Sequence, residues 1–343
     1  MRRESTAWLS VITVLVGLSC QVTEPGIVEF DPIYQFVDVQ FADEQTGILV
    51  ANTSVYFTGN GGRTWRYSRG APTYLHGGGF ADTQTALVVG NNTTVLRTAD
   101  GGLTWSNPFD DMDLGYTPGF KGVSFVDARR GWIVGGSDVY KTIDGGATWT
   151  RQWITSSHIY AGCFTDSLNG TVVTNNSIVR TVDGGKTWIK QKEKIPEILL
   201  GVDFLNRDTG IAVGTEGLIL RTDDGGTNWT TQRKSPDGVG QLWDVQFIDV
   251  NTCVVVGSGG LILKTTDAGA TWTEHESHTD QRLHAVAFVS AEVGMIVGGN
   301  SAILRTSNGG ATWSLVRFWT SLEKPDHPSL SSFHPLDTGI TRP

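Results

Sequence analysis

An eight-residue motif occurs seven times in this chain of 343 residues, and it restricts the possible folds more than any other feature. Every copy begins with Thr, carries Gly at its fifth position and ends with Trp. The copies are Thr58–Trp65, Thr98–Trp105, Thr142–Trp149, Thr181–Trp188, Thr222–Trp229, Thr265–Trp272 and Thr306–Trp313. Successive tryptophans are 40, 44, 39, 41, 43 and 41 residues apart. A period near 40 residues with turn residues in every copy is typical of a β-propeller.

A single repeat contains the strands of one blade. In the fifth repeat, alternating or β-branched segments at 200–205, 211–214, 218–222 and from 228 onward are separated by turns rich in Gly, Asp and Asn. The 43 glycines and the charged fraction of 18% also favour an all-β protein with many short strands. We therefore predict a seven-bladed β-propeller over residues 36–316, with four antiparallel strands in each blade.

The motif is predicted to form the hairpin between the third and fourth strands of each blade. Its glycines supply the positive φ angles that such a turn requires. The side chain at its third position can accept hydrogen bonds from amides of its own turn, and the Trp buries a large ring against neighbouring strands. The seven residues at that third position are therefore predicted to stabilise the fold and not to catalyse a reaction: Asn60, Asp100, Asp144, Asp183, Asp224, Asp267 and Asn308.

Residues 1–20 are predicted to be a signal peptide, so we expect an exported protein that is periplasmic, lumenal or at the cell surface. Arg2 and Arg3 form a basic start, and the apolar stretch Trp8–Leu18 is too short to span a bilayer comfortably. Cys20 follows a small residue, as in bacterial lipoprotein signals, and is a candidate for lipidation that would tether the protein to a membrane. Plain signal cleavage is the alternative. Residues 21–35 are predicted to be a linker, and residues 317–343 an extended or disordered tail that contains prolines.

The composition argues against several classes of function. A net charge of −9 does not favour binding to nucleic acid or to an anionic membrane surface. The three cysteines and seven histidines show no metal-ligand spacing, so neither a metal nor a cofactor is predicted.

One position differs from repeat to repeat, and it lies four residues before the Phe that ends the first strand. It is occupied by Val37, His76, Lys121, Tyr160, Leu200, Trp243 and His284. In a propeller, this position surrounds one mouth of the central channel. Its polar and aromatic members, His76, Lys121, Tyr160, Trp243 and His284, are predicted to bind a partner. Packing that is particular to each blade mouth is the alternative.

A second position is basic in six of the seven repeats: Arg97, Lys141, Arg180, Arg221, Lys264 and Arg305. Its regular recurrence favours ion pairs within each blade, with Asp82, Asp127, Asp166 and Asp249 as partners. Contact with a binding partner is the alternative. Lys121, Arg129 and Arg130 depart from the repeat pattern, and we predict that they form an asymmetric basic patch for a partner.

The T-x-D-G-G-x-T-W pattern of the motif resembles the Asp-box of BNR repeats, which occurs in sialidases, xyloglucanases, sortilin-type receptors and assembly-factor propellers. Seven uniform blades after an export signal most resemble the photosystem II stability and assembly factor family. The segments Phe125-Val126-Asp127 and Leu304-Arg305-Thr306 are similar to that family's F-x-D turn and its L-R-T lead into the box. The resemblance implies a non-enzymatic scaffold whose protein partners are membrane-protein assembly intermediates of photosystem II.

The main alternative is a propeller that binds or hydrolyses glycans. Sialidases have an early F/Y-R-I-P motif that is absent here, whereas many glycosidases need only two carboxyl groups about 5–10 Å apart. Sugar clefts are usually built from long inserted loops, for which the near-constant repeat leaves little room. A pair of facing carboxylates beside stacking aromatic rings would favour this alternative. A third possibility, a purely structural surface repeat protein, would lack any patch that departs from the sevenfold pattern.

Overall fold

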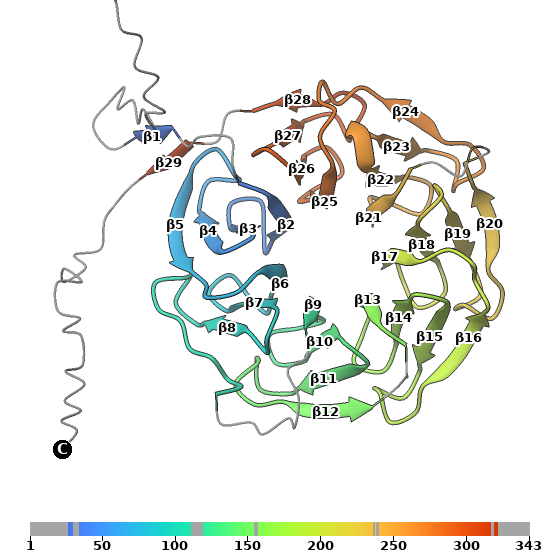
Figure 1. Cartoon of the computed structure of the whole chain (residues 1–343), viewed down its shortest axis with the longest axis horizontal. Coiled ribbons are helices and arrows are strands. Elements are labelled where there is room, and N and C mark those ends of the chain that lie inside the picture. The colour runs from blue at the N-terminus through green and yellow to red at the C-terminus, as the bar shows by residue number, and fades with distance from the viewer. Residues whose placement is uncertain are drawn as a thin grey trace, which may run out of the picture.

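Seven β-sheets surround a central axis in the computed structural model, and each presents one edge to that axis (Figure 1). The structure describes residues 27–29, 34–110, 119–153, 157–235, 237, 240–316 and 319–321. The strands of each blade follow one another in the sequence, so each blade is one continuous stretch of chain. The predicted all-β, seven-bladed propeller is thereby confirmed.

Within each blade the chain passes from the axis to the periphery in antiparallel strands. The innermost strands are β2 (Phe36–Phe41), β6 (Leu75–Phe80), β9 (Phe120–Phe125), β13 (Ile159–Phe164), β17 (Leu199–Phe204), β21 (Leu242–Phe247) and β25 (Leu283–Phe288). The second strands are β3 (Gly47–Ala51), β7 (Ala86–Gly90), β10 (Gly131–Gly135), β14 (Gly170–Thr174), β18 (Gly210–Gly214), β22 (Cys253–Gly257) and β26 (Gly294–Gly298). The third strands are β4 (Ser54–Thr58), β8 (Val95–Thr98), β11 (Asp138–Thr142), β15 (Ser177–Thr181), β19 (Ile219–Thr222), β23 (Ile262–Thr265) and β27 (Ile303–Thr306). The outer strands are β5 (Trp65–Gly70), β12 (Thr150–Trp153), β16 (Ile189–Glu193), β20 (Thr230–Arg233), β24 (Thr273–His275) and β28 (Ser314–Leu315).

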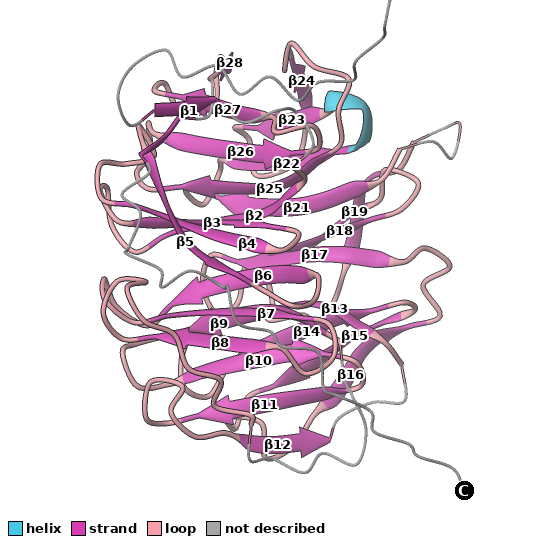
Figure 2. Cartoon of the chain, turned by 60° about the vertical axis from the view of Figure 1, so that its left-hand side comes forward, coloured by secondary structure: helices cyan, strands magenta, loops and turns pink. Residues whose placement is uncertain are grey.

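The strands run through the thickness of the disc, so each one joins its two faces (Figure 2). We call the face on which the innermost strands begin the mouth face. The innermost and third strands run in the same direction and end on the opposite face. That face carries the hairpins that hold the Asp-boxes, and we call it the box face.

Blade 2 departs from the four-strand plan. Its sheet contains β6, β7 and β8, and an isolated bridge between Arg97 and Ser106 takes the place of a fourth strand. Beyond this bridge the buried ring of Phe109 packs against Phe120 and Tyr140 of blade 3, with ring centroids 5.4 and 5.3 Å apart. The chain that would extend an outer strand therefore contributes to the core between two blades.

Each Asp-box closes the hairpin between the third and fourth strand positions, as blade 3 illustrates. The buried Thr142 hydroxyl donates to Asp144 Oδ1 (2.8 Å) and accepts from the Gly146 amide (2.9 Å). Asp144 also accepts from the amide and the hydroxyl of Thr148 (2.9 and 2.6 Å). Gly146 has a φ of +82°, which residues with a side chain rarely adopt. The first Thr of each box donates in the same way to Asn60, Asp100, Asp144, Asp183, Asp224, Asp267 and Asn308.

The hydrophobic core of the described residues consists of seven clusters, each shared by two neighbouring blades. One of them joins the two ends of the array, because Phe36 and Trp65 of blade 1 pack with Ala285 of blade 7. The Ser301 amide of blade 7 also donates to the Tyr34 carbonyl (2.7 Å). Burial between blades is thus what makes each repeat depend on its neighbours.

Two short strands outside the blades lie on the outer edge of blade 1. β29 (Trp319–Ser321) pairs in parallel with β5, and β1 (Ile27–Glu29) pairs antiparallel with β29. β1 falls in the predicted linker and β29 in the predicted tail. The predicted signal peptide and Cys20 lie outside the described residues. Within the described ranges, no helix is long and apolar enough to cross a membrane.

Two of the recurring basic residues, Arg97 and Lys141, connect neighbouring blades. Arg97 Nε donates to the Gly145 carbonyl of the next blade (2.8 Å), and Lys141 Nζ donates to the Gly184 carbonyl (2.9 Å). Arg221 forms an ion pair within its own blade, but with the neighbouring Asp223 (2.8 Å). The predicted partners instead accept hydrogen bonds from amides of their own turns: Asp82, Asp127, Asp166 and Asp249. Among the described residues no direct salt bridge joins these aspartates to the recurring basic residues, but the charges of Arg180 and Lys264 contribute to lowering the pKa of Asp166 and Asp249.

Candidate functional site

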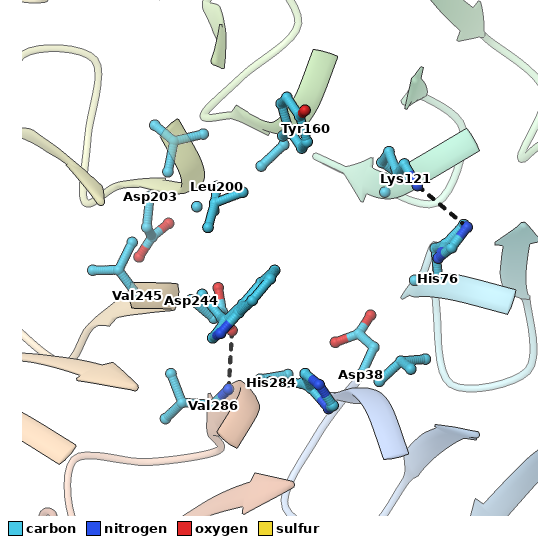
Figure 3. Close-up of a pocket in the computed structure, with 18 of the residues that line it drawn as sticks. Asp38, His76, Lys121, Tyr160, Leu200, Asp203, Asp244, Val245, His284 and Val286 are labelled. Atoms are coloured by element: carbon cyan, nitrogen blue, oxygen red, sulfur yellow. Dashed lines mark hydrogen bonds between the residues drawn. The ribbon is translucent and has the colours of Figure 1, made fainter. Parts of the chain in front are cut away.

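The innermost strands enclose a central cavity of about 630 Å³. All seven blades contribute to its lining, and the side chains labelled in Figure 3 surround one open space at the axis. The variable position of the repeats contributes Val37, His76, Lys121, Tyr160, Leu200, Trp243 and His284 to this lining. The structure thus brings these seven residues together at the mouth face.

A β-bulge places each of these residues in the lining. In blade 1, Phe36 pairs with Ala51 and Asp38 pairs with Val50, so Val37 has no partner on the second strand. The same register shift occurs in the other six blades, and the skipped residues are His76, Lys121, Tyr160, Leu200, Trp243 and His284. A bulge turns the extra residue out of the regular alternation of the strand. Each blade therefore presents to the channel one side chain whose identity is not restricted by pairing with the second strand.

Two basic residues of neighbouring blades meet on one side of the cavity. Lys121 Nζ lies 3.3 Å from His76 Nε2, and this Nε2 also lies 2.8 Å from Asn91 Oδ1 (Figure 3). Burial lowers the pKa of the Lys121 ammonium and is also the largest cause of the lowered pKa of His76. At neutral pH the His76 imidazole is therefore uncharged.

Aromatic and basic groups face each other on another side of the cavity. The Arg282 guanidinium lies 4.7 Å from the centroid of the Trp243 ring, close enough for a cation–π interaction. The His284 ring is T-shaped to the same Trp243, with centroids 6.2 Å apart. His284 Nδ1 donates to the Phe36 carbonyl (2.7 Å), so this residue also ties blade 7 to blade 1. Tyr160 lines the cavity from blade 4 and packs against His158.

The predicted basic patch of Lys121, Arg129 and Arg130 is not a single surface. Lys121 stands near the start of β9 on the mouth face, whereas Arg129 and Arg130 lie in the turn after β9 on the box face. At about 3.3 Å per residue, the strand alone separates them by about 13 Å. Arg130 pairs with Asp127 (2.6 Å), and Arg129 Nε donates to the Ile143 carbonyl (3.3 Å). The predicted single patch does not form, because residues at the two ends of one strand are close in the sequence but lie on opposite faces of the disc.

Three acids lie in the lining, Asp38 buried and the other two half-buried, and sequence comparison of the repeats did not single them out. They are Asp38, Asp203 and Asp244 (Figure 3). Burial raises the pKa of Asp38 to about 6 and that of Asp244 to about 7, and it also raises the pKa of Asp203. The sequence does contain a signal for two of them. Asp38 and Asp244 occupy the position directly after the variable one, and the other blades have Gly or Ala at that position.

These acids accept hydrogen bonds from backbone amides of the next blade. Asp38 binds the Gly78 amide (2.8 Å), Asp203 the Phe247 amide (2.9 Å) and Asp244 the Val286 amide (2.9 Å). Innermost strands pair with a neighbour on one edge only, so their axial amides need acceptors from elsewhere. The three carboxyl groups therefore join blades around the axis.

The site offers charge, aromatic surface and a rigid frame, but among the described residues no group of His, Cys, Asp and Glu could hold a metal ion. Asp100, Asp183 and Asp267 have pKa values lowered to about 2, chiefly by hydrogen bonds from the second Thr of their boxes. They lie on the box face, away from the cavity lining. The arrangement is suited to binding, and the residues of the Asp-boxes take no part in it.

Comparisons with known proteins give one family and several similar folds. The family model described as photosynthesis system II assembly factor YCF48 matches residues 71–157, 153–237, 190–274 and 237–332. The solved structure of YCF48 bound to D1 peptide has a TM-score of 0.68 and 20% identity, covering 85% of this chain and 100% of that one. YCF48 from Cyanidioschyzon merolae has a TM-score of 0.67 and 20% identity, covering 82% and 97%.

An enzyme is among the similar folds. The GH74 xyloglucanase from Xanthomonas campestris has a TM-score of 0.64 and 14% identity, covering 84% of this chain and 54% of that one. At such identities the solved structures show the shared fold alone. No curated protein sequence matches the chain.

Proposed function

The chain belongs to the photosynthesis system II assembly factor YCF48 family, and we propose that it is a non-enzymatic scaffold that docks a protein partner at the mouth of its central channel. The observation that carries this proposal is the set of seven bulged residues around one cavity. The recurring residues of the Asp-boxes have a structural task, whereas this position varies and combines Tyr160 and Trp243 with basic groups. Aromatic and cationic residues are those enriched at protein interfaces.

The partner class follows from the family and from the rigidity of the site. We infer that a segment of a membrane protein under assembly inserts into the mouth, in line with the D1 peptide named for the related structure. The mouth is preformed by bulges and interblade hydrogen bonds, so little of its own conformational freedom is lost on binding. Export through residues 1–20, with or without a lipid on Cys20, belongs to the same proposal, since it would place the mouth beside a membrane.

Glycoside hydrolysis is the second candidate, because the cavity holds three acids beside Trp243 and a xyloglucanase shares the fold. Against it, Asp38, Asp203 and Asp244 are each engaged with a backbone amide. A catalytic acid pair must instead be free to reach a glycosidic oxygen and a water or sugar carbon. Hydrolysis of xyloglucan that is lost on Asp244→Asn would favour the enzyme.

Affinity capture from the protein's own host, followed by mass spectrometry, tests the docking proposal. We expect membrane-protein subunits or their precursors to be captured by the wild-type protein and lost with a Tyr160→Ala, Trp243→Ala double variant. Leu103→Ala with Ile143→Ala is a matched control, because both side chains are exposed on the box face. Capture that the mouth variant retains, or that the box-face variant loses, would show that the mouth is not the docking site.

A further inference from the structure

The Lys121 ammonium lies half-buried in the cavity wall, with an imidazole nitrogen as its hydrogen-bond neighbour. That nitrogen, Nε2 of His76, also contacts Asn91 Oδ1. One imidazole nitrogen can serve only one of the two, since it carries either a proton to donate or a lone pair to accept. When it donates to Asn91, the Lys121 ammonium has no acceptor among the described residues.

The acids of the cavity do not compensate this positive charge. Asp38 accepts from the Gly78 amide and from the side chain of Gln40 (3.1 Å), and the other two acids bind amides of the next blade. None of the salt bridges between described residues includes Lys121. A desolvated ammonium without a counter-charge is unfavourable and favours binding of an anion from outside the chain.

A third basic side chain borders the same corner. His158 lies just before β13, is exposed, and is T-shaped to Tyr160 with centroids 4.9 Å apart. Burial is the largest cause of the lowered pKa of both His76 and His158, and the charge of Lys121 is a further cause. Three neighbouring blades thus bring basic side chains close enough for their charges to influence one another. A carboxylate, whose two oxygens accept several hydrogen bonds, fits this arrangement.

We propose that the corner formed by His76, Lys121 and His158 binds a carboxylate of the partner, and binds it more tightly as the pH falls from neutral to mildly acidic. This inference rests on the proposed docking at the mouth. An acidic side chain and a C-terminal carboxylate share the required chemistry. The imidazoles gain protons as the pH falls, whereas a carboxylate stays ionised down to about pH 4.3.

Several other titratable groups face the cavity, and the acids among them with raised pKa values change in the same direction. The groups are Asp38 of β2, Tyr160 and Cys163 of β13, Asp203 of β17, Asp244 of β21, and Arg282 and His284 at the start of β25. Asp38 and Asp244, with pKa values of about 6 and about 7, lose negative charge as the pH falls. His284, whose pKa is lowered chiefly by burial, gains positive charge as the pH falls. Acidification therefore makes the whole cavity more attractive to an anion.

Three acetylated tetrapeptides test the proposal by NMR titration of the full protein with labelled histidines. One is tetra-alanine with a free C-terminal carboxylate, the second is Ala-Ala-Glu-Ala amide, and the third is Ala-Ala-Gln-Ala amide. We expect saturable shifts of the His76 and His158 ring signals with at least one carboxylate peptide, a raised pKa of His76 in its presence, and several-fold tighter binding near pH 5.5 than near pH 7.5. The Gln peptide should cause none of these changes.

The response of the two carboxylate peptides distinguishes their sources, and a response to either supports the proposal. Lys121→Gln should abolish the response, whereas Lys186→Gln, an exposed lysine on the box face, should preserve it. Two results with the wild-type protein would overturn the proposal. One is equal shifts of the histidine signals with the Glu and Gln peptides, and the other is no shift with either carboxylate peptide. If the peptides fail while the mouth variant still loses its captured partner, the docking function stands and only the carboxylate site is refuted.

Discussion

The carboxyl group of Asp244 accepts a hydrogen bond of 2.9 Å from the backbone amide of Val286 in the next blade. That amide belongs to β25, an innermost strand whose axial edge has no paired strand in its sheet. Asp38 and Gly78 have the same relationship across blades 1 and 2 (2.8 Å). Side chains thus supply the acceptors that a fifth strand would supply in a wider sheet. The ionisation of these side chains therefore influences stability.

Replacing Asp244 by Asn should flatten the dependence of stability on pH. Burial raises the pKa of Asp244 to about 7 in the folded protein, against about 3.9 in an unfolded chain. Between those values the folded state holds a proton that the unfolded state has lost, so stability falls as pH rises from about 4 to about 7, on the order of 2–4 kcal/mol for this residue. Urea unfolding between these pH values compares the two proteins. Parallel curves for wild type and variant would contradict the expectation.

Removing the acceptor altogether should have a different effect. Asp244→Ala leaves the Val286 amide buried and unpaired, which costs about 1–3 kcal/mol. The effect should be largest near pH 5, where the wild-type carboxyl group is protonated and carries no unfavourable charge. Asp244→Asn is the matched control because its amide oxygen still accepts. An alanine variant as stable as the asparagine variant at pH 5 would show that the hydrogen bond contributes nothing.

Thr142 tests the Asp-box as a structural element. Its buried hydroxyl both donates to Asp144 and accepts from the Gly146 amide, so Thr142→Val should destabilise the protein by about 1–3 kcal/mol. Thr142→Ser keeps the hydroxyl and should recover most of this loss. Denaturant unfolding of the three proteins measures the difference. Equal stability of the Val and Ser variants would show that the hydroxyl does not contribute to stability.

The bond from Arg97 to the Gly145 carbonyl predicts local coupling between blades 2 and 3. Arg97→Met should lower the local stability of the blade 3 box by about 1 kcal/mol, because the carbonyl loses a charged donor. Hydrogen exchange at the Gly145 and Gly146 amides should accelerate accordingly. Arg63→Met, an exposed arginine of the blade 1 box, should leave those rates unchanged.

The two described cysteines should be unreactive in the folded protein. Burial raises the pKa of the Cys163 and Cys253 thiols well above the ordinary value, so neither forms appreciable thiolate at pH 8. Iodoacetamide labelling followed by peptide mass spectrometry should modify them only after denaturant is added. Rapid labelling of Cys253 under native conditions would mean that the blade 5 to blade 6 core opens readily.

Part of the site was predictable because the repeats act as an internal comparison. The variable residues, from His76 to His284, were identified from their position before the Phe that ends each first strand, and the structure places all of them in the cavity lining. Lys121 and Arg129 were wrongly assigned to one patch. They are only eight residues apart in the sequence, but the strand between them crosses the disc. The role of Asp244 was missed because its acceptor function depends on an amide 42 residues further along the chain.

The sequence by itself determined the number of blades, the hairpin in each of them and the identity of the varied position, because turn chemistry and strand alternation are local and repeat with every blade. The tertiary structure alone decided what the varied position does. A bulge in each innermost strand turns that residue toward the axis, and ring closure brings His76 and Lys121 of neighbouring blades within 3.3 Å of each other. Pairing register and interblade packing involve residues some forty positions apart, and no local pattern encodes the distances between them.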